Sequence, residues 1–129
     1  MRKKFIIVIC SFVVLLMNLV IPVHAQIYYD TNTDITLTLT FHSNVALCYA
    51  NVDGGKSVTE ITNGVLTLTD SNGTEIEKWD NLSSSSSMLI VSKTAKNVTK
   101  GETYTLTITV TVKTSSSSEV ISESITKTY

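Results

Sequence analysis

Apolar and polar residues alternate along most of this chain, and this alternation limits the fold more than any other feature of the sequence. From Tyr104 to Val112 every second residue is apolar and every residue between is a threonine. A period of two places the two sets of side chains on opposite faces of a β-strand, where β-branched threonine packs well. After residue 25 no segment keeps a helical period for longer than a turn. The sequence therefore predicts an all-β fold.

Seven segments of this kind follow one another between residues 34 and 129, with polar turns between them. The expected strands span residues 35–41, 45–52, 65–69, 74–79, 88–91, 104–112 and 120–129. The tetrad Asp70-Ser71-Asn72-Gly73 predicts a hairpin, because Asn and Gly tolerate positive φ. Trp79 is out of phase with Ile76, which predicts a bulge or a twist near Glu77. Short strands with frequent turns are typical of a β-sandwich, so we predict such a domain over residues 34–129, after a short segment over 26–33.

The first 25 residues have the layout of a secretory signal peptide. Arg2-Lys3-Lys4 precede an apolar run from Phe5 to Val23, and Val23-His24-Ala25 supplies the small residues of a cleavage site. We therefore expect cleavage after Ala25 and a secreted, extracellular protein. An uncleaved N-terminal membrane anchor is the alternative, since the apolar run is nearly long enough to cross a bilayer.

The charge of the remaining chain argues against nucleic acid as a partner. Residues 26–129 contain seven lysines, no arginine and eleven acidic residues. Proteins that bind nucleic acid normally present a basic surface. We therefore predict no nucleic-acid partner and, once the signal is removed, no membrane partner.

The same residues offer few groups for metal binding, with one histidine (His42) and one cysteine (Cys48). A zinc site needs three or four ligands, so zinc is not expected. The segment Asp30–Asp34 has the alternating oxygen donors that open a calcium loop. That loop needs glycine at its sixth position and an acid at its twelfth, where this chain has Ile35 and Phe41. We predict no metal and no cofactor.

Catalysis is not expected either. His42 is the only histidine that could act as a general base in a serine hydrolase, and no G-x-S-x-G nucleophile elbow accompanies it. Glu75 and Glu77 share one face of a strand, but that face is opposite Ile76 and therefore on the solvent side. The sequence predicts that the protein is not an enzyme.

Cys48 has no intramolecular partner once Cys10 leaves with the signal peptide. It shares its strand face with Ala46 and Ala50, which favours a buried thiol over an intermolecular disulfide. We expect the structural core to contain Cys48, Trp79, Tyr104 and Leu106.

The segment Gly101-Glu102-Thr103-Tyr104-Thr105-Leu106 resembles the start of strand F in immunoglobulin-like and fibronectin type III domains. In those domains a tyrosine two residues before a core position folds its hydroxyl back onto the preceding corner. The resemblance implies an immunoglobulin-like β-sandwich of about seven antiparallel strands, with Leu106 at that core position. With its signal peptide and threonine-rich strands, the chain also resembles small secreted β-sandwich proteins of Gram-positive bacteria, a group without a known active site.

That topology would bring the loops 53–63, 80–87 and 113–118 together at one end, and 43–44, 70–73 and 94–101 at the other. Long loops gathered at one end of a sandwich often carry recognition. The candidate binding residues there are Lys56, Glu60, Lys113 and Glu119. Sugar binding would instead use exposed tyrosines, of which Tyr28, Tyr29, Tyr49 and Tyr129 are the candidates.

We therefore expect a secreted, non-catalytic interaction or adhesion module that binds an unidentified protein or glycan. The alternative is a structural or assembly subunit that pairs with other chains through its edge strands. The sequence leaves the oligomeric state open.

Overall fold

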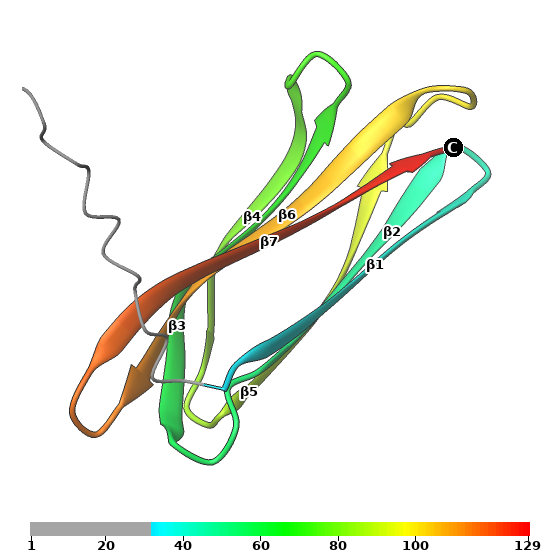
Figure 1. Cartoon of the computed structure of the whole chain (residues 1–129). Coiled ribbons are helices and arrows are strands. Elements are labelled where there is room, and N and C mark those ends of the chain that lie inside the picture. Colours follow the sequence, from blue (N-terminus) through cyan, green and yellow to red (C-terminus); the bar gives the residue numbers. More distant parts are fainter. Residues whose placement is uncertain (1–31) are drawn as a thin grey trace, which may run out of the picture.

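The computed structural model describes residues 32–129, which form two antiparallel sheets packed face to face (Figure 1). The strands are β1 (Asp34–His42), β2 (Val45–Asp53), β3 (Val58–Asp70), β4 (Glu75–Ser84), β5 (Met88–Lys96), β6 (Thr103–Thr114) and β7 (Ser118–Thr128). Sheet A has the order β1-β2-β5, and sheet B has the order β4-β3-β6-β7. The prediction of an all-β sandwich of about seven antiparallel strands is confirmed. The predicted signal peptide, 1–25, lies outside the described residues, as do positions 26–31.

Over residues 32–129 the structure contains no helix, and hence none that could cross a membrane. The fourth strand hydrogen-bonds to the third, on the sheet that also holds the sixth and seventh. In immunoglobulin terms β4 occupies the place of the C′ strand rather than that of strand D. Sheet A therefore has three strands and faces four in sheet B.

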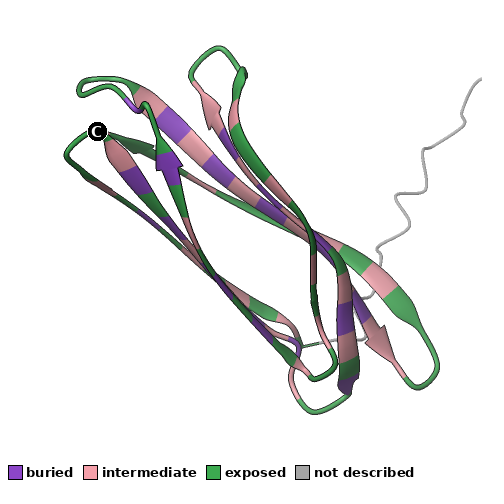
Figure 2. Ribbon diagram, turned by 180° about the vertical axis from the view of Figure 1, so that it is seen from behind, coloured by how far each residue is buried: buried purple, intermediate pink, exposed green. Residues whose placement is uncertain are grey.

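The core forms where the alternating apolar residues of the two sheets meet. On β6 the residues Tyr104, Leu106, Ile108, Val110 and Val112 are all buried, and the threonines between them face outward (Figure 2). Sheet A contributes Ala46, Cys48, Ala50 and Val52 from β2, along with residues of β1 and β5. Full burial of a large aliphatic side chain is worth about 1.5–3 kcal/mol. Because the described residues contain no disulfide, the burial of these side chains, and not a covalent cross-link, stabilises the sandwich.

Three strands are much longer than predicted. β3 begins at Val58 instead of residue 65, β4 continues to Ser84, and β5 continues to Lys96. In β3 the buried residue Ile61 is out of step with both Val58 and Leu66, because the pairing with β6 shifts register between Val58 and Glu60 and again between Thr62 and Val65. Such bulges break the period of two, so the predicted loop 53–63 is wrong and only residues 54–57 connect β2 to β3.

The predicted bulge near Glu77 is confirmed. Leu68 pairs with Glu77 and Thr69 pairs with Glu75, so β4 carries one extra residue, Ile76, at this point.

The three connections β2–β3, β4–β5 and β6–β7 lie together at one end of the sandwich (Figure 1). The backbone N–H of Gly54 donates to the carbonyl of Ser87 at 2.8 Å, which joins the first two of these connections directly. The other three connections lie at the opposite end, beside the C-terminal end of β7. The two groups of loops therefore have the predicted arrangement.

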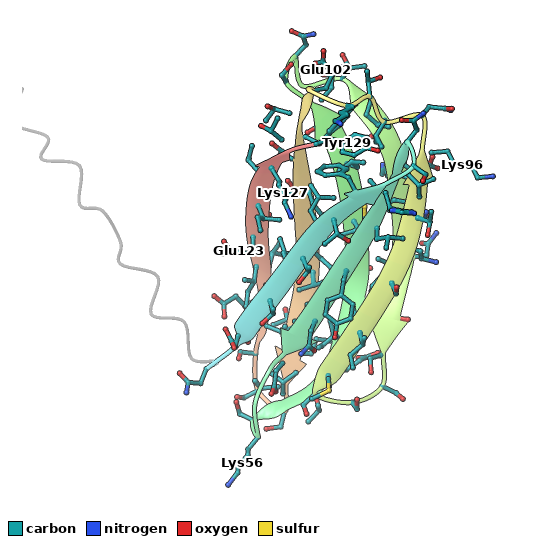
Figure 3. All side chains as sticks on the ribbon, turned by 90° about the vertical axis from the view of Figure 1, so that its right-hand side faces the viewer. Lys56, Lys96, Glu102, Glu123, Lys127 and Tyr129 are labelled. Carbon is teal, nitrogen blue, oxygen red and sulfur yellow. The ribbon has the colours of Figure 1, made fainter. Side chains whose placement is uncertain are left out.

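Two tyrosines stabilise that opposite end of the sandwich by ring packing and hydrogen bonds. The Tyr104 hydroxyl accepts a hydrogen bond from the backbone N–H of Thr99 at 2.8 Å, which is the corner contact that the strand-F resemblance implied. The Tyr129 ring stacks on Phe41 at a centroid distance of 4.9 Å, and its hydroxyl accepts from the N–H of Asn44 at 3.0 Å. Tyr129 is therefore packed into the end of the sandwich beside the turn that contains Glu102 (Figure 3), and it does not present a free face to a sugar.

Candidate binding groove beside β5

The structure does not gather the four predicted binding residues into one loop cluster. Only Lys56 lies in a loop, and it projects from the end that holds the β2–β3, β4–β5 and β6–β7 connections (Figure 3). Glu60 lies in β3, Lys113 in β6 and Glu119 in β7, so their assignment to loops is wrong. The cause is the same early start of β3, together with a β6–β7 connection of only residues 115–117.

Lys113 and Glu60 instead interact with each other across β3 and β6. The distance from Lys113 Nζ to Glu60 Oε2 is 3.1 Å, and the two side chains are 41% and 45% exposed. An ion pair this exposed contributes at most about 1 kcal/mol. It joins two adjacent strands and leaves neither charge without a counterion.

The structure places three of the four expected core residues in the buried interior. Cys48, Tyr104 and Leu106 are buried, whereas Trp79 is only partly buried. Desolvation by burial raises the pKa of the Cys48 thiol to about 11. A thiol that stays neutral near pH 7 is a poor nucleophile, so Cys48 behaves as a small apolar residue.

Trp79 is less buried because of its position in β4, the edge strand of sheet B. On one side of the sandwich β1 lies against β7, and on the other β5 lies against both β3 and β4. With three strands facing four, sheet A does not fully cover β4. The inward side chains Ile76, Trp79 and Leu82 therefore pack against the core and remain partly exposed.

A groove of about 400 Å³ lies along this uncovered margin. It is lined by Asn81, Leu82 and Ser83 of β4 and by residues 89–93 of β5. Asn81 has a left-handed backbone with φ of 56°, which asparagine tolerates better than most residues. Gly64 lets β3 approach β4 closely at this point, because a Cβ on Gly64 would lie 2.7 Å from the carbonyl oxygen of Leu82.

Lys93 is the only charged residue that lines the groove. It has the same strand parity as the buried residues Leu89, Val91 and Ala95, so it points between the sheets, where it is half-buried. Within residues 32–129 it forms no ion pair. A partly buried lysine can accept an acidic partner, and no ion pair within residues 32–129 occupies it.

The outer face of sheet A is mostly polar but carries three exposed large apolar side chains. Ile90 is 58% exposed, Leu47 is 49% exposed and Met88 is 43% exposed. Tyr49 lies between Thr38 and Ser92 in the same sheet. Groove and face together form one continuous candidate surface around β5.

Sequence reasoning missed this site. Residues 81–83 fell in a predicted loop, and Lys93 fell beyond the predicted end of the fifth strand. One signal was present in the sequence, since extending the alternation of Leu89 and Val91 by two residues places a lysine on the inner face.

The described part of the chain gives less support to metal binding and to catalysis. No group of three or more His, Cys, Asp or Glu side chains between residues 32 and 129 could hold a metal ion. His42 is exposed at the end of β1, and Glu75 and Glu77 are exposed on β4. Part of the calcium-like segment, residues 30 and 31, lies outside the described residues.

Comparison with known proteins gave structural likenesses only. A scan against protein-family models and a search of the curated proteins found no match. Among solved structures, the β-glucuronidase of Parabacteroides merdae aligns with a TM-score of 0.46 at 13% identity, covering 72% of this chain and 13% of that chain. The β-D-glucuronidase of Dictyoglomus thermophilum aligns with a TM-score of 0.40 at 15% identity, covering 71% of this chain and 14% of that one.

A protein from Archaeoglobus fulgidus aligns with a TM-score of 0.41 at 13% identity, covering 74% of this chain and 95% of that chain. This chain thus spans a small part of the two glucuronidases and nearly all of the archaeal protein. We draw no functional conclusion from these likenesses.

Proposed function

We propose that the protein is a secreted, non-catalytic interaction module that binds a partner protein through the groove and the outer face of sheet A. The observation that carries this proposal is the exposed apolar pair Met88 and Ile90 on β5 at the edge of the groove, with Leu47 exposed further along the same face. Contiguous exposed apolar residues on a small domain are a common sign of a protein-binding surface.

The rest of the surface has a different character. The outer face of sheet B is covered mainly by threonine and serine hydroxyls from β3, β6 and β7, with Val120 as its one exposed large apolar side chain. Edge strand β4 carries exposed Glu75, Glu77 and Lys78, and edge strand β7 carries exposed Glu123 and Lys127. Charges on an edge strand oppose pairing with another chain. This contrast favours β5 and its surroundings as the binding surface.

A protein partner fits this surface better than a glycan. Sandwich domains usually hold sugars on exposed planar aromatic rings. On the outer face of sheet A, Tyr49 is the one residue among Phe, Tyr and Trp, and it is half-buried. The apolar contacts of aliphatic side chains suit a polypeptide.

Site-specific photo-cross-linking in the producing cells tests this proposal. A benzoylphenylalanine at position 47, on the outer face of sheet A, should give a covalent adduct with a second protein. The same group at position 124, on the outer face of sheet B, is the matched control. Equal cross-linking from both positions, or none from position 47, would contradict the proposal.

Secretion is part of the same proposal. The exported protein should begin at Gln26, which N-terminal sequencing of the culture supernatant would establish. Retention of the full chain in the membrane fraction would favour the anchor alternative.

Assembly through edge strands is the second candidate function. It is favoured by β7, an edge strand of eleven residues. Size-exclusion chromatography over a concentration series separates the two candidates. We expect a monomer throughout, because Glu123 and Lys127 oppose pairing at this edge, and a ladder of oligomers would favour assembly.

A further inference from the structure

We infer that the groove accepts an extended segment of a partner protein, which adds to β5 as a fourth strand of sheet A and lies over β4. This inference rests on the proposed function, since it uses the same surface. Strand addition draws its affinity from main-chain hydrogen bonds and its specificity from alternate side chains.

The unequal sheets define a space of suitable width. Sheet A has three strands and sheet B has four, and the surplus strand of sheet B is β4. A strand added to the free edge of β5 would lie about 4.8 Å from it, above the inner face of β4. There it would cover the partly exposed side chains Ile76, Trp79 and Leu82, which no strand within residues 32–129 covers fully.

The first half of the free edge of β5 is also poorly protected, since the two lysines of this strand, Lys93 and Lys96, lie in its second half. Residues 88–92 contain no charge and no proline, and Met88 and Ile90 are exposed. An apolar edge strand of this kind is prone to pair with another strand.

A single segment fits this space better than a second copy of the sandwich. A copy that approached through its own β5 would bring its β4 into the layer that β4 occupies here. An isolated extended segment carries no second sheet and avoids that overlap.

Lys93 indicates one feature of the sequence that binds. Lys93 lines the groove, is partly buried as a residue and forms no ion pair within residues 32–129. An aspartate or glutamate on the inner face of the added strand would supply that partner. Apolar residues two positions before and after this acid would face β4. The inferred ligand is therefore an extended segment with alternate apolar residues interrupted by one acid.

The test is a nuclear magnetic resonance titration of the secreted protein with the capped peptide Thr-Val-Thr-Asp-Thr-Val-Thr. The expected result is a set of amide shifts confined to β5, residues 89–93, and to residues 81–83 of β4. The peptide with lysine in place of aspartate should bind about fivefold more weakly, as the loss of about 1 kcal/mol implies.

Two charge variants make the test specific. Lys93→Glu should reverse the preference between the two peptides. Lys96→Glu makes the same charge change on the same strand outside the groove, where Lys96 projects into solvent (Figure 3), and should leave the preference unaltered. Shifts elsewhere in the molecule, or an unchanged preference in Lys93→Glu, would overturn the inference.

The remaining outcomes are also decisive. If a peptide of residues 26–33 displaces the probe and binds more tightly, the occupant is a segment of this chain and the partner inference falls. If Lys93→Glu changes only the tendency to self-associate, Lys93 protects the edge and does not recognise an acid. Loss of strand addition leaves the cross-link from position 47 intact, so its failure is distinguishable from failure of the proposed function.

Discussion

Tyr104 links the start of β6 to the connection that precedes it. Its ring lies in the core beside Phe41, at a centroid distance of 5.6 Å, while its hydroxyl reaches the N–H of Thr99. One side chain therefore both fills the interior and satisfies a partly buried backbone donor.

Tyr104→Phe should keep the packing and remove that hydrogen bond. We expect the free energy of unfolding to fall by about 1–3 kcal/mol, because the N–H of Thr99 loses its partner. Urea unfolding measures the change. Tyr49→Phe is the matched control, since the Tyr49 hydroxyl forms no hydrogen bond within residues 32–129. Equal losses in both variants would contradict the role given to the corner contact.

Cys48 should make stability depend on pH at the alkaline end. Its thiol has a pKa of about 11 in the folded protein and 9.0 as its ordinary value. Between these values the folded protein retains a proton that the unfolded chain has lost, so the free energy of unfolding falls as pH rises from about 9 to about 11. The contribution is on the order of 2 kcal/mol.

Urea unfolding of the parent and of Cys48→Ala across that pH range isolates this contribution, because the lysines and tyrosines are common to both proteins. The decline with pH should be shallower in Cys48→Ala. Parallel pH profiles, or rapid labelling of the Cys48 thiol without denaturant, would show that it is not buried in solution.

At the scale of elements, β7 is attached to β6 by side chains as well as by the backbone. Four hydroxyl pairs bridge the two strands at 2.8–2.9 Å: Thr103–Thr128, Thr105–Thr126, Thr107–Ser124 and Thr109–Ser122. Cross-strand pairs of this type each contribute about 0.2–1 kcal/mol. The alternating threonines thus also hold an edge strand in register.

A double-mutant cycle of Thr107→Val and Ser124→Ala should reveal this coupling as about 0.2–1 kcal/mol in the free energy of unfolding. The matched control is the pair Thr38 and Ser92, which lie on strands separated by β2 and should show no coupling. A coupling of zero between Thr107 and Ser124 would mean that water satisfies the two hydroxyls equally well.

Gly64 determines how closely β4 approaches β3. Gly64→Ala would place a methyl group 2.7 Å from the carbonyl oxygen of Leu82 and 2.8 Å from its Cβ, and neither atom belongs to a flexible side-chain tip. We expect a loss of about 1–3 kcal/mol in the free energy of unfolding. Thr67→Ala, on the outer face of the same strand, is the control. Similar stabilities for the two variants would contradict the close approach.

At the scale of the whole molecule, the described part of the fold contains no covalent cross-link, since Cys48 is a free thiol there. Thermal unfolding of the protein should therefore occur at the same temperature with and without a reducing agent. A lower melting temperature under reduction would reveal an intermolecular disulfide through Cys48. Non-reducing electrophoresis of the same samples separates the two results.

The sequence alone determined the fold class, most strand positions, the loops that share each end and the corner at Tyr104. These features depend on local alternation and on turn residues, which act over a few positions. The alternation from Tyr104 to Val112 specifies one inner and one outer face whatever the neighbouring strand is.

Tertiary structure decided the features that do not depend on local alternation or on turn residues. The early start of β3 depends on bulges against β4 and β6, which interrupt the period that the sequence displays. The candidate groove depends on β4 joining the sheet of β6, which leaves three strands facing four. Lys93 lines a groove only because that arrangement leaves the space between β4 and the free edge of β5 uncovered. Pairing between distant strands is not encoded in any short window, and for that reason the candidate binding surface could be found only in the folded molecule.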